Sequence, residues 1–166
     1  EPPIRNSGFV GGLFLSRREL KDANGDNFDE TNLYVGAELQ ILKHRFELLG
    51  SNNGTLKYME DSDHKFIRSN TGQAIGKLSR HAGIREACVN GELAARFGIS
   101  NGNNKVPVSD LATMLGEYDM LDNKDGTKIS THELITLARK SRDPTGTVVD
   151  MQLLIDEIIE PGNRFY

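Results

Sequence analysis

The stretch from Asp122 to Glu133, DNKDGTKISTHE, is the part of the chain that decides the expected fold. Acidic and amide side chains and a glycine come first, followed by the aliphatic Ile129 and, four residues later, by Glu133. A helix–loop–helix calcium site needs oxygen side chains at alternate loop positions, a turn residue at the sixth and a carboxylate at the twelfth. The order of residues therefore predicts a metal-binding loop between two helices.

Three other stretches repeat this order of polar loop, apolar residue and oxygen side chain. Two of them end on an acid, whereas the first copy along the chain ends on the amide of Asn32. One such stretch is common in ordinary turns, because Asn, Asp and Gly tolerate turn backbones. Repetition makes the functional interpretation stronger. The three stretches, with their apolar residues, are 22–32 with Phe28, 51–60 with Leu56 and 101–110 with Val106.

These four stretches resemble the loops of the EF-hand family, and with their flanking helices they cover about half of the chain. In that family two loops pair back to back through the apolar residue at the eighth loop position. The resemblance implies that Phe28 faces Leu56 and that Val106 faces Ile129, in two short antiparallel bridges. The expected fold class is all-α, with two pairs of EF-hand-like motifs, connecting helices and a C-terminal helix.

The first loop places Asp22, Asn24 and Asp26 at the first, third and fifth positions that the family uses as ligands. It is one residue short and has an amide where the family has its clamping acid. A neutral amide cannot supply a bidentate carboxylate, so calcium binding should be weak. Asp29 is a candidate ligand in an altered geometry.

The fourth loop carries the most charge. Its candidate calcium ligands are Asp119, Asp122, Asp125 and Glu133, although the spacing from its glycine to Ile129 is one residue longer than in the family. The second and third loops have Leu49 and Ile99 at the first position, where the family has aspartate, and we expect them to be free of metal. The expected cofactor is therefore Ca²⁺, bound weakly at one or two sites.

The expected organisation has five parts. An irregular lead-in is followed by a first EF-hand-like pair, connecting helices broken near Gly83, a second pair, and a turn with a C-terminal helix. The corresponding ranges are 1–15, 16–70, 71–98, 99–141 and 142–166. The apolar periodicity and capping patterns predict helices at 17–22, 33–49, 58–68, 72–97 (in two pieces), 109–118, 131–140 and 148–159.

Composition limits the other classes of function. The chain has 166 residues and a net charge of −4, without the clustered cations that nucleic-acid binding needs. Cys88 is the only cysteine, so no internal disulfide can form. The apolar run from Gly8 to Leu15 is short and rich in glycine, and predicts neither a signal peptide nor a membrane span.

Two competing interpretations are weaker. Residues 92–100 resemble the first helix and turn of a helix-turn-helix DNA-binding unit, but the glycine and proline that follow oppose a recognition helix. The cluster of Glu60, Asp61, Asp63 and His64 is better explained as a solvated helix face than as a hydrolytic site, so we expect no enzyme. The favoured function is calcium binding that stabilises the structure or modulates contact with another protein. The alternative is an EF-hand-like interaction scaffold that needs no metal.

Overall fold

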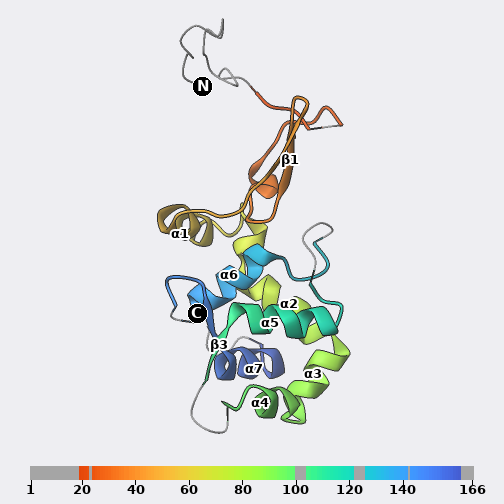
Figure 1. The fold of residues 1–166 in the computed structure, drawn as a ribbon, viewed down its shortest axis with the longest axis vertical. Helices are drawn as coiled ribbons and strands as arrows, with labels where there is room; N and C mark the ends of the chain where they lie inside the picture. The colour runs from red at the N-terminus through yellow and green to blue at the C-terminus, as the bar shows by residue number, and fades with distance from the viewer. Residues whose placement is uncertain (1–18, 23, 100–103, 122–125, 142, 162–166) are drawn as a thin grey trace, which may run out of the picture.

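The computed structural model describes residues 19–22, 24–99, 104–121, 126–141 and 143–161. A short β-rich segment comes first and a helical body follows (Figure 1). The elements are η1 (Glu30–Asn32), β1 (Glu38–Ile41), β2 (His44–Glu47), α1 (Asn53–Asp61), η2 (Ile67–Ser69), α2 (Thr71–Arg80), α3 (Ala82–Val89), α4 (Glu92–Arg96), β3 (Lys105–Pro107), α5 (Val108–Glu117), α6 (Thr131–Lys140), β4 (Val148–Asp150) and α7 (Met151–Ile159).

Strands β1 and β2 form an antiparallel hairpin that projects from the helical body (Figure 1). Leu39 faces Phe46 across the two strands, and Ile41 faces His44, so Leu42 and Lys43 alone make the turn. Leu42 adopts a left-handed backbone with φ of 59°. A two-residue hairpin turn requires a positive φ at its first central residue, which explains this conformation.

The expected helix over residues 33–49 is therefore wrong, and so is the all-α fold class. The described chain combines helices with two small antiparallel sheets, β1–β2 and β3–β4. The apolar residues Leu39 and Ile41 suit the two-residue period of a strand as well as a broad helical face. A positive φ at Leu42 is incompatible with a right-handed helix, and the turn that it makes decides between the two periods.

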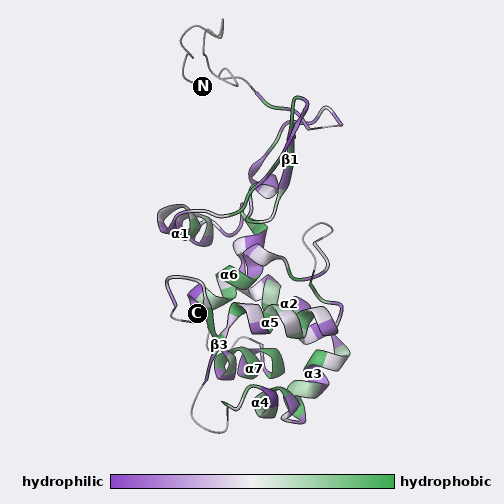
Figure 2. Ribbon diagram, viewed as in Figure 1, coloured by the Kyte–Doolittle hydropathy of each residue, from purple (hydrophilic) through white to green (hydrophobic). Residues whose placement is uncertain are grey.

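Helices α2 to α7 share one hydrophobic core, shown by the apolar segments that face the interior of the body in Figure 2. Residues 72–97 are helical as expected, but they form three helices, α2, α3 and α4, and not two. The first break lies at His81 and not near Gly83, and the second lies at Asn90 and Gly91. The His81 side chain caps α3 by accepting from the Ile84 amide. These helices pack directly on α7 and α6. The largest fully buried apolar side chains are Leu78, Ile84, Leu93, Leu111, Met114, Leu115, Ile129, Leu137, Met151, Leu154 and Ile158.

The second sheet joins two helix–loop–helix units. Strand β3 lies between α4 and α5, β4 lies between α6 and α7, and the register sets Val106 opposite Val149. This is the back-to-back loop pairing that the EF-hand resemblance implies, but with a different partner. The expected pairing of Val106 with Ile129 is wrong, because Ile129 forms an isolated parallel bridge with Leu121.

The expected pairing of Phe28 with Leu56 is also wrong. The side chain of Asn52 accepts from the Thr55 amide and starts α1 at Asn53, so Leu56 lies in a helix and not in a loop. The Phe28 amide instead donates to the carbonyl of Leu20. Residues 19–22 are not helical, and the rest of the helix expected at 17–22 lies outside the described residues.

The stretch 105–107, where a helix-turn-helix unit would continue its recognition helix, is strand β3. The described chain thus gives no support to the DNA-binding alternative. The C-terminal helix starts at Met151 and not at Val148, because residues 148–150 are drawn into the sheet by their pairing with β3.

Candidate functional site

The carboxylate of Glu133, at the end of the fourth predicted loop, is held in the first turn of α6. Ser130 caps this helix, and the two residues form a reciprocal capping box. The Oε2 atom of Glu133 accepts from the Ser130 amide at 2.8 Å and from its hydroxyl at 2.9 Å. The residue is only 1% exposed. A buried carboxylate of this kind needs a cationic or hydrogen-bonding partner for its second oxygen.

That partner is Lys77, which comes from α2. Its ammonium nitrogen lies 2.6 Å from Oε1 of Glu133 and also donates to the backbone carbonyl of Lys128 at 3.0 Å. The two side chains are 11% and 1% exposed, so this ion pair lies in the protein interior. Sequence reasoning missed Lys77 because it lies 56 residues before its partner.

Of the other candidate ligands of the fourth loop, the described ranges include Asp119, which is not bound to Glu133. The side chain of Asp119 is 90% exposed and pairs with Lys128 at 2.8 Å. Its backbone φ of 53° is a conformation that Asp tolerates better than most residues. Asp122 and Asp125 lie outside the described residues.

The first predicted loop is a tight turn at the end of a short β-bridge between Lys21 and Asn27. Asp22 organises it, because Oδ1 accepts from the backbone amides of Asn24 and Asp26, each at 2.9 Å. The side-chain amide of Asn24 donates to the second oxygen of Asp22 at 3.3 Å. These contacts explain the clustering of Asp and Asn here as turn chemistry.

Asp29 has a separate role as the cap of η1. Its Oδ1 accepts from the amide and the hydroxyl of Thr31, and Asn32 returns a contact by accepting from the Asp29 amide. The hydroxyl and amide of Thr31 lower the pKa of the Asp29 carboxyl below its ordinary value. Asn32, at the clamping position of the first loop, and the candidate ligand Asp29 are thus both engaged in a capping box.

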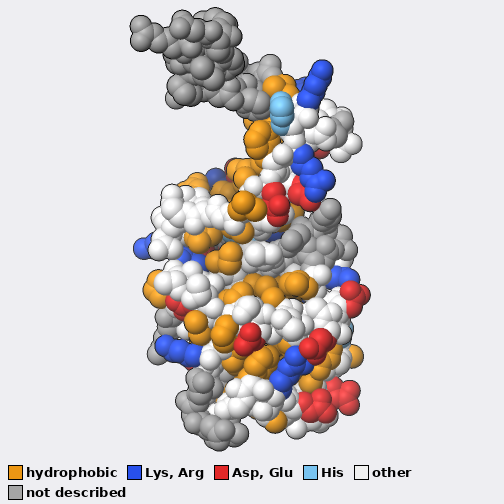
Figure 3. Space-filling view, viewed as in Figure 1, with side chains coloured by type: hydrophobic (Ala, Val, Ile, Leu, Met, Phe, Trp, Pro, Cys, Tyr) orange, Lys and Arg blue, Asp and Glu red, His pale blue; other side chains and the backbone are white. Residues whose placement is uncertain are grey.

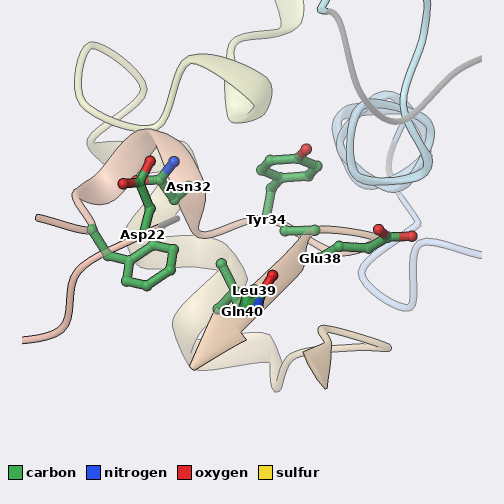
Figure 4. A pocket seen from close by; sticks show the side chains of 8 residues that line it. Asp22, Asn32, Tyr34, Glu38, Leu39 and Gln40 are labelled. Carbon is green, nitrogen blue, oxygen red and sulfur yellow. The ribbon is translucent and has the colours of Figure 1, made fainter. Parts of the chain in front are cut away.

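A pocket of about 240 Å³ lies between this turn and the hairpin (Figure 4). Asp22 and Asn32 lie close together on one side of it, and Glu38 lies further away, beyond Tyr34 (Figure 4). Within the described ranges, no group of three or more His, Cys, Asp or Glu side chains could hold a metal ion together. The oxygen atoms of this pocket do not fit a calcium ion, which takes six to eight oxygen ligands.

The loop that precedes β4 is organised by Asp143. One oxygen accepts from the amide and hydroxyl of Thr145, and the other from the amides of Thr147 and Val148. These contacts, with the Thr145 hydroxyl as the largest cause, hold the pKa of Asp143 well below its usual range. The carboxylate is thus saturated by its own loop.

His132 is a second residue whose partners sequence reasoning missed. It is 1% exposed, its Nδ1 accepts from the amide of Val35 at 3.1 Å, and its Nε2 lies 2.7 Å from the hydroxyl of Ser69. Since Nδ1 accepts, the neutral ring carries its proton on Nε2 and donates it to Ser69. Burial lowers the pKa of His132 to about 4.

A buried ion pair joins α1 to α6. The guanidinium of Arg139 lies 2.6 Å from the carboxylate of Glu60 and also contacts Asn53 and the carbonyl of Pro144. Glu60 was expected to be the last residue of the second loop. It lies in a helix, as the expected helix at 58–68 implies, but its charge is neutralised by Arg139 from the C-terminal half.

The fold defines a class: an EF-hand-like pair of helical units preceded by a β-hairpin segment. Residues 1–55 match the family model described as the DM10 domain. This family model covers the part of the chain that contains β1 and β2. The matched region ends shortly after the start of α1. None of the sequence patterns described above predicted this match.

The chain is related to proteins named for EF-hand domains. It is 30% identical over 147 residues to EF-hand domain-containing family member C2 of Danio rerio, covering 84% of this chain and 18% of that protein. It is 32% identical over 165 residues to the protein of the same name from Mus musculus, covering 93% of this chain and 20% of that protein. A third relative, EF-hand domain-containing protein 1 of Homo sapiens, is 32% identical over 92 residues, covering 52% of this chain and 14% of that protein.

The expected relationship to EF-hand proteins is thereby confirmed. The chain spans about a fifth of the length of the C2 relatives that it matches. No helix within the described ranges is long and apolar enough to cross a membrane.

Proposed function

We propose that this chain is a calcium-independent EF-hand-like module that acts through protein contacts within a larger protein. The observation that carries this proposal is the register of β3 and β4, which sets Val106 opposite Val149. Counting each as the eighth residue of its loop places Ile99 and Arg142 first, and Asp110 and Leu153 twelfth. Three of these four residues supply no carboxylate, although calcium needs one at both positions.

Three other acids of the helical body support the same interpretation. Glu133 is bonded to Lys77, Glu60 to Arg139 and Asp143 to backbone amides of its own loop. A calcium ion would have to break these contacts before it could bind. The paired loops therefore favour a structural use of the fold over calcium sensing.

The projecting hairpin supports the protein-contact part of the proposal. Leu42 at its tip is 53% exposed and has a positive φ, a backbone that costs a leucine free energy and suits glycine. Strained residues are often retained where function needs their side chain. Figure 3 shows hydrophobic, basic and histidine side chains beside one another on this projecting part.

Site-specific cross-linking tests the contact. A photoreactive residue replaces Leu42 in the full-length protein within its native cells, and the same residue at Val89, which is 62% exposed on α3, is the control. We expect discrete cross-linked proteins from position 42 that are absent from position 89. Equal or no cross-linking at the two positions would contradict the proposal.

Calorimetry tests the metal-independent part. Calcium is titrated to millimolar concentration into metal-stripped protein. We expect no heat of binding beyond dilution. A saturable signal would instead support the calcium-binding function that the loop sequences predict.

A further inference from the structure

We propose that the outer edge of strand β2 is a self-association surface, on which β2 of a second copy of this chain pairs antiparallel. The two β1–β2 hairpins then form one continuous sheet around a two-fold axis. Self-association goes beyond the proposed function, because a contact of the hairpin tip with another protein does not require it. The hydrogen-bond pattern of the hairpin and the charges on β2 carry this proposal.

The backbone of β2 has hydrogen-bonding groups that point away from its neighbour. Within the described chain its sheet consists of β1 and β2 alone. The Leu48 amide donates to the carbonyl of Ala37, so these two residues are a hydrogen-bonded pair of the antiparallel ladder. Such pairs alternate with pairs whose backbone groups point outwards. In the observed register, the amides and carbonyls of Arg45 and Glu47 therefore point to the outer edge of β2.

The two edges of the hairpin differ in what lies beside them. The turn that contains Asp22 and Asn32 lies beside β1, across the pocket shown in Figure 4. No strand or bridge of the described chain pairs with the outer side of β2, and all four of its residues are exposed. The hairpin also projects from the helical body (Figure 1). An exposed edge of this kind presents unpaired backbone groups to which another strand readily adds.

The charges on the hairpin favour a second copy as the partner. Glu38 and Glu47 lie directly opposite each other in the ladder, where like charges are destabilising. Arg45 binds Glu38 at 2.6 Å, whereas Glu47 forms no ion pair within the described chain. The Arg45 side chain remains 71% exposed, so it can contact a further carboxylate. Arg45 of a second copy therefore matches the cation that Glu47 lacks.

Charge also selects one register for this pairing. A two-fold axis at Phe46 places Arg45 of each copy opposite Glu47 of the other, in hydrogen-bonded positions of the new ladder. Moving the register by two residues sets Arg45 opposite Arg45, or Glu47 opposite Glu47. At the axis Phe46 faces its own copy in the closely spaced position, where aromatic pairs stabilise a sheet. Its side chain is 39% exposed and available for this contact.

The test reverses the charges on β2 in the 166-residue chain. Arg45→Glu and Glu47→Arg are made singly, and Lys57→Glu, at an exposed position of α1, is the matched control. Circular dichroism verifies that each variant keeps the helical signal of the wild type. Sedimentation velocity then measures association at about 10–500 μM protein, a range suited to a small and weak interface.

We expect the wild type and Lys57→Glu to form dimers as the concentration rises. Each β2 variant alone should associate at least about tenfold more weakly, because like charges then face each other across the axis. An equal mixture of Arg45→Glu and Glu47→Arg chains should regain the association of the wild type. In that mixed pair, position 45 of each chain faces the opposite charge at position 47 of the other.

A wild-type chain that stays monomeric over the whole range would overturn the inference, and it is the result expected if the edge pairs with a different protein. A β2 variant that associates as well as the wild type would also overturn it, as would a mixture that stays monomeric. Assemblies larger than a dimer would contradict a closed two-fold pair. These results would leave the proposed function intact, because that function is tested by cross-linking at Leu42 and by calcium titration.

Discussion

The backbone amide of Val35 donates to Nδ1 of His132 at 3.1 Å, which joins the segment before the hairpin to the first turn of α6. The two residues are 97 positions apart, and both are buried. The other ring nitrogen contacts Ser69 of η2, so one imidazole connects three separate segments. This contact requires a neutral ring, because a protonated imidazole has no acceptor for the Val35 amide.

Stability should therefore fall in mild acid. The pKa of His132 is lowered by burial from 6.5 to about 4 in the folded chain. The unfolded state therefore binds the proton more readily than the folded state. The contribution of neutral His132 to the free energy of unfolding is complete above pH 6.5 and is lost as the pH falls towards 4. Lowering the pH from 7 to 5 should reduce the free energy of unfolding by about 2 kcal/mol through this residue.

Urea unfolding at pH 7 and pH 5 measures this loss. The His132→Gln variant should be less stable at pH 7 and should lose less stability on acidification than the wild type. His64→Gln, at an exposed position, is the matched control and should keep the wild-type pH dependence. Identical pH dependence in His132→Gln and wild type would show that this histidine does not control the acid response.

The ion pair of Arg139 with Glu60 should contribute strongly to the packing of α1 on α6. Replacing Arg139 with Met leaves Glu60 charged at a site where the two side chains are only 9% and 12% exposed. Removing one partner of a buried pair typically costs about 3 kcal/mol, and we expect a loss of this size in chemical denaturation. Arg85→Met, on the exposed face of α3, should change stability by less than about 0.5 kcal/mol. Equal effects of the two substitutions would refute the structural role of the pair.

Gly146 and Gly98 form a matched pair of substitution sites. Both have a positive φ, 71° at Gly146 and 65° at Gly98. A Cβ atom added at Gly146 would lie 2.9 Å from Cγ2 of Ile135, whereas a Cβ atom added at Gly98 would have no such neighbouring atom within 4 Å. Gly98→Ala should cost about 1 kcal/mol from backbone strain alone. Gly146→Ala should cost about 1–3 kcal/mol more, because it also overpacks the contact with α6. Comparable losses in thermal unfolding would argue against the close approach of this loop to α6.

The hairpin turn offers a stabilising substitution. Leu42→Gly removes the strain of a left-handed leucine, and we expect the free energy of unfolding to rise by about 0.5–1 kcal/mol. Val89→Gly, an exposed helical position, should instead lower stability by about the same amount. A destabilised Leu42→Gly protein would mean that the leucine side chain packs on the chain itself.

Much of the helical body could be predicted from the sequence because its signals are local. The Ser130 and Glu133 pattern marks the start of α6, whose observed bounds of Thr131–Lys140 match the expected ones. The back-to-back loop pairing was also anticipated in kind. The partner of Val106 in this pairing was not predicted correctly, because the choice between Ile129 and Val149 depends on how distant helices pack.

The β1–β2 hairpin, and the basic residues that pair with Glu133 and Glu60, could not be predicted from local sequence patterns. Residues 38–47 satisfy helical and strand periods at once, and a leucine in a hairpin turn hides the usual glycine or asparagine signal. The contacts of Lys77 with Glu133 and of Arg139 with Glu60 span 56 and 79 residues. Glu133 and Glu60, which ended two of the expected metal-binding loops, are therefore neutralised by side chains that lie outside those loops.

The most direct test of a calcium-independent fold is the ¹H–¹⁵N correlation spectrum of the metal-stripped wild-type chain, recorded before and after addition of 5 mM calcium. The amides of Ile129, Ser130 and Glu133 report on the Lys77 contact, and that of Val149 reports on the paired loops. We predict that these resonances are present without metal and do not move when calcium is added. Saturable shifts of these amides, or their appearance only with calcium, would contradict the account.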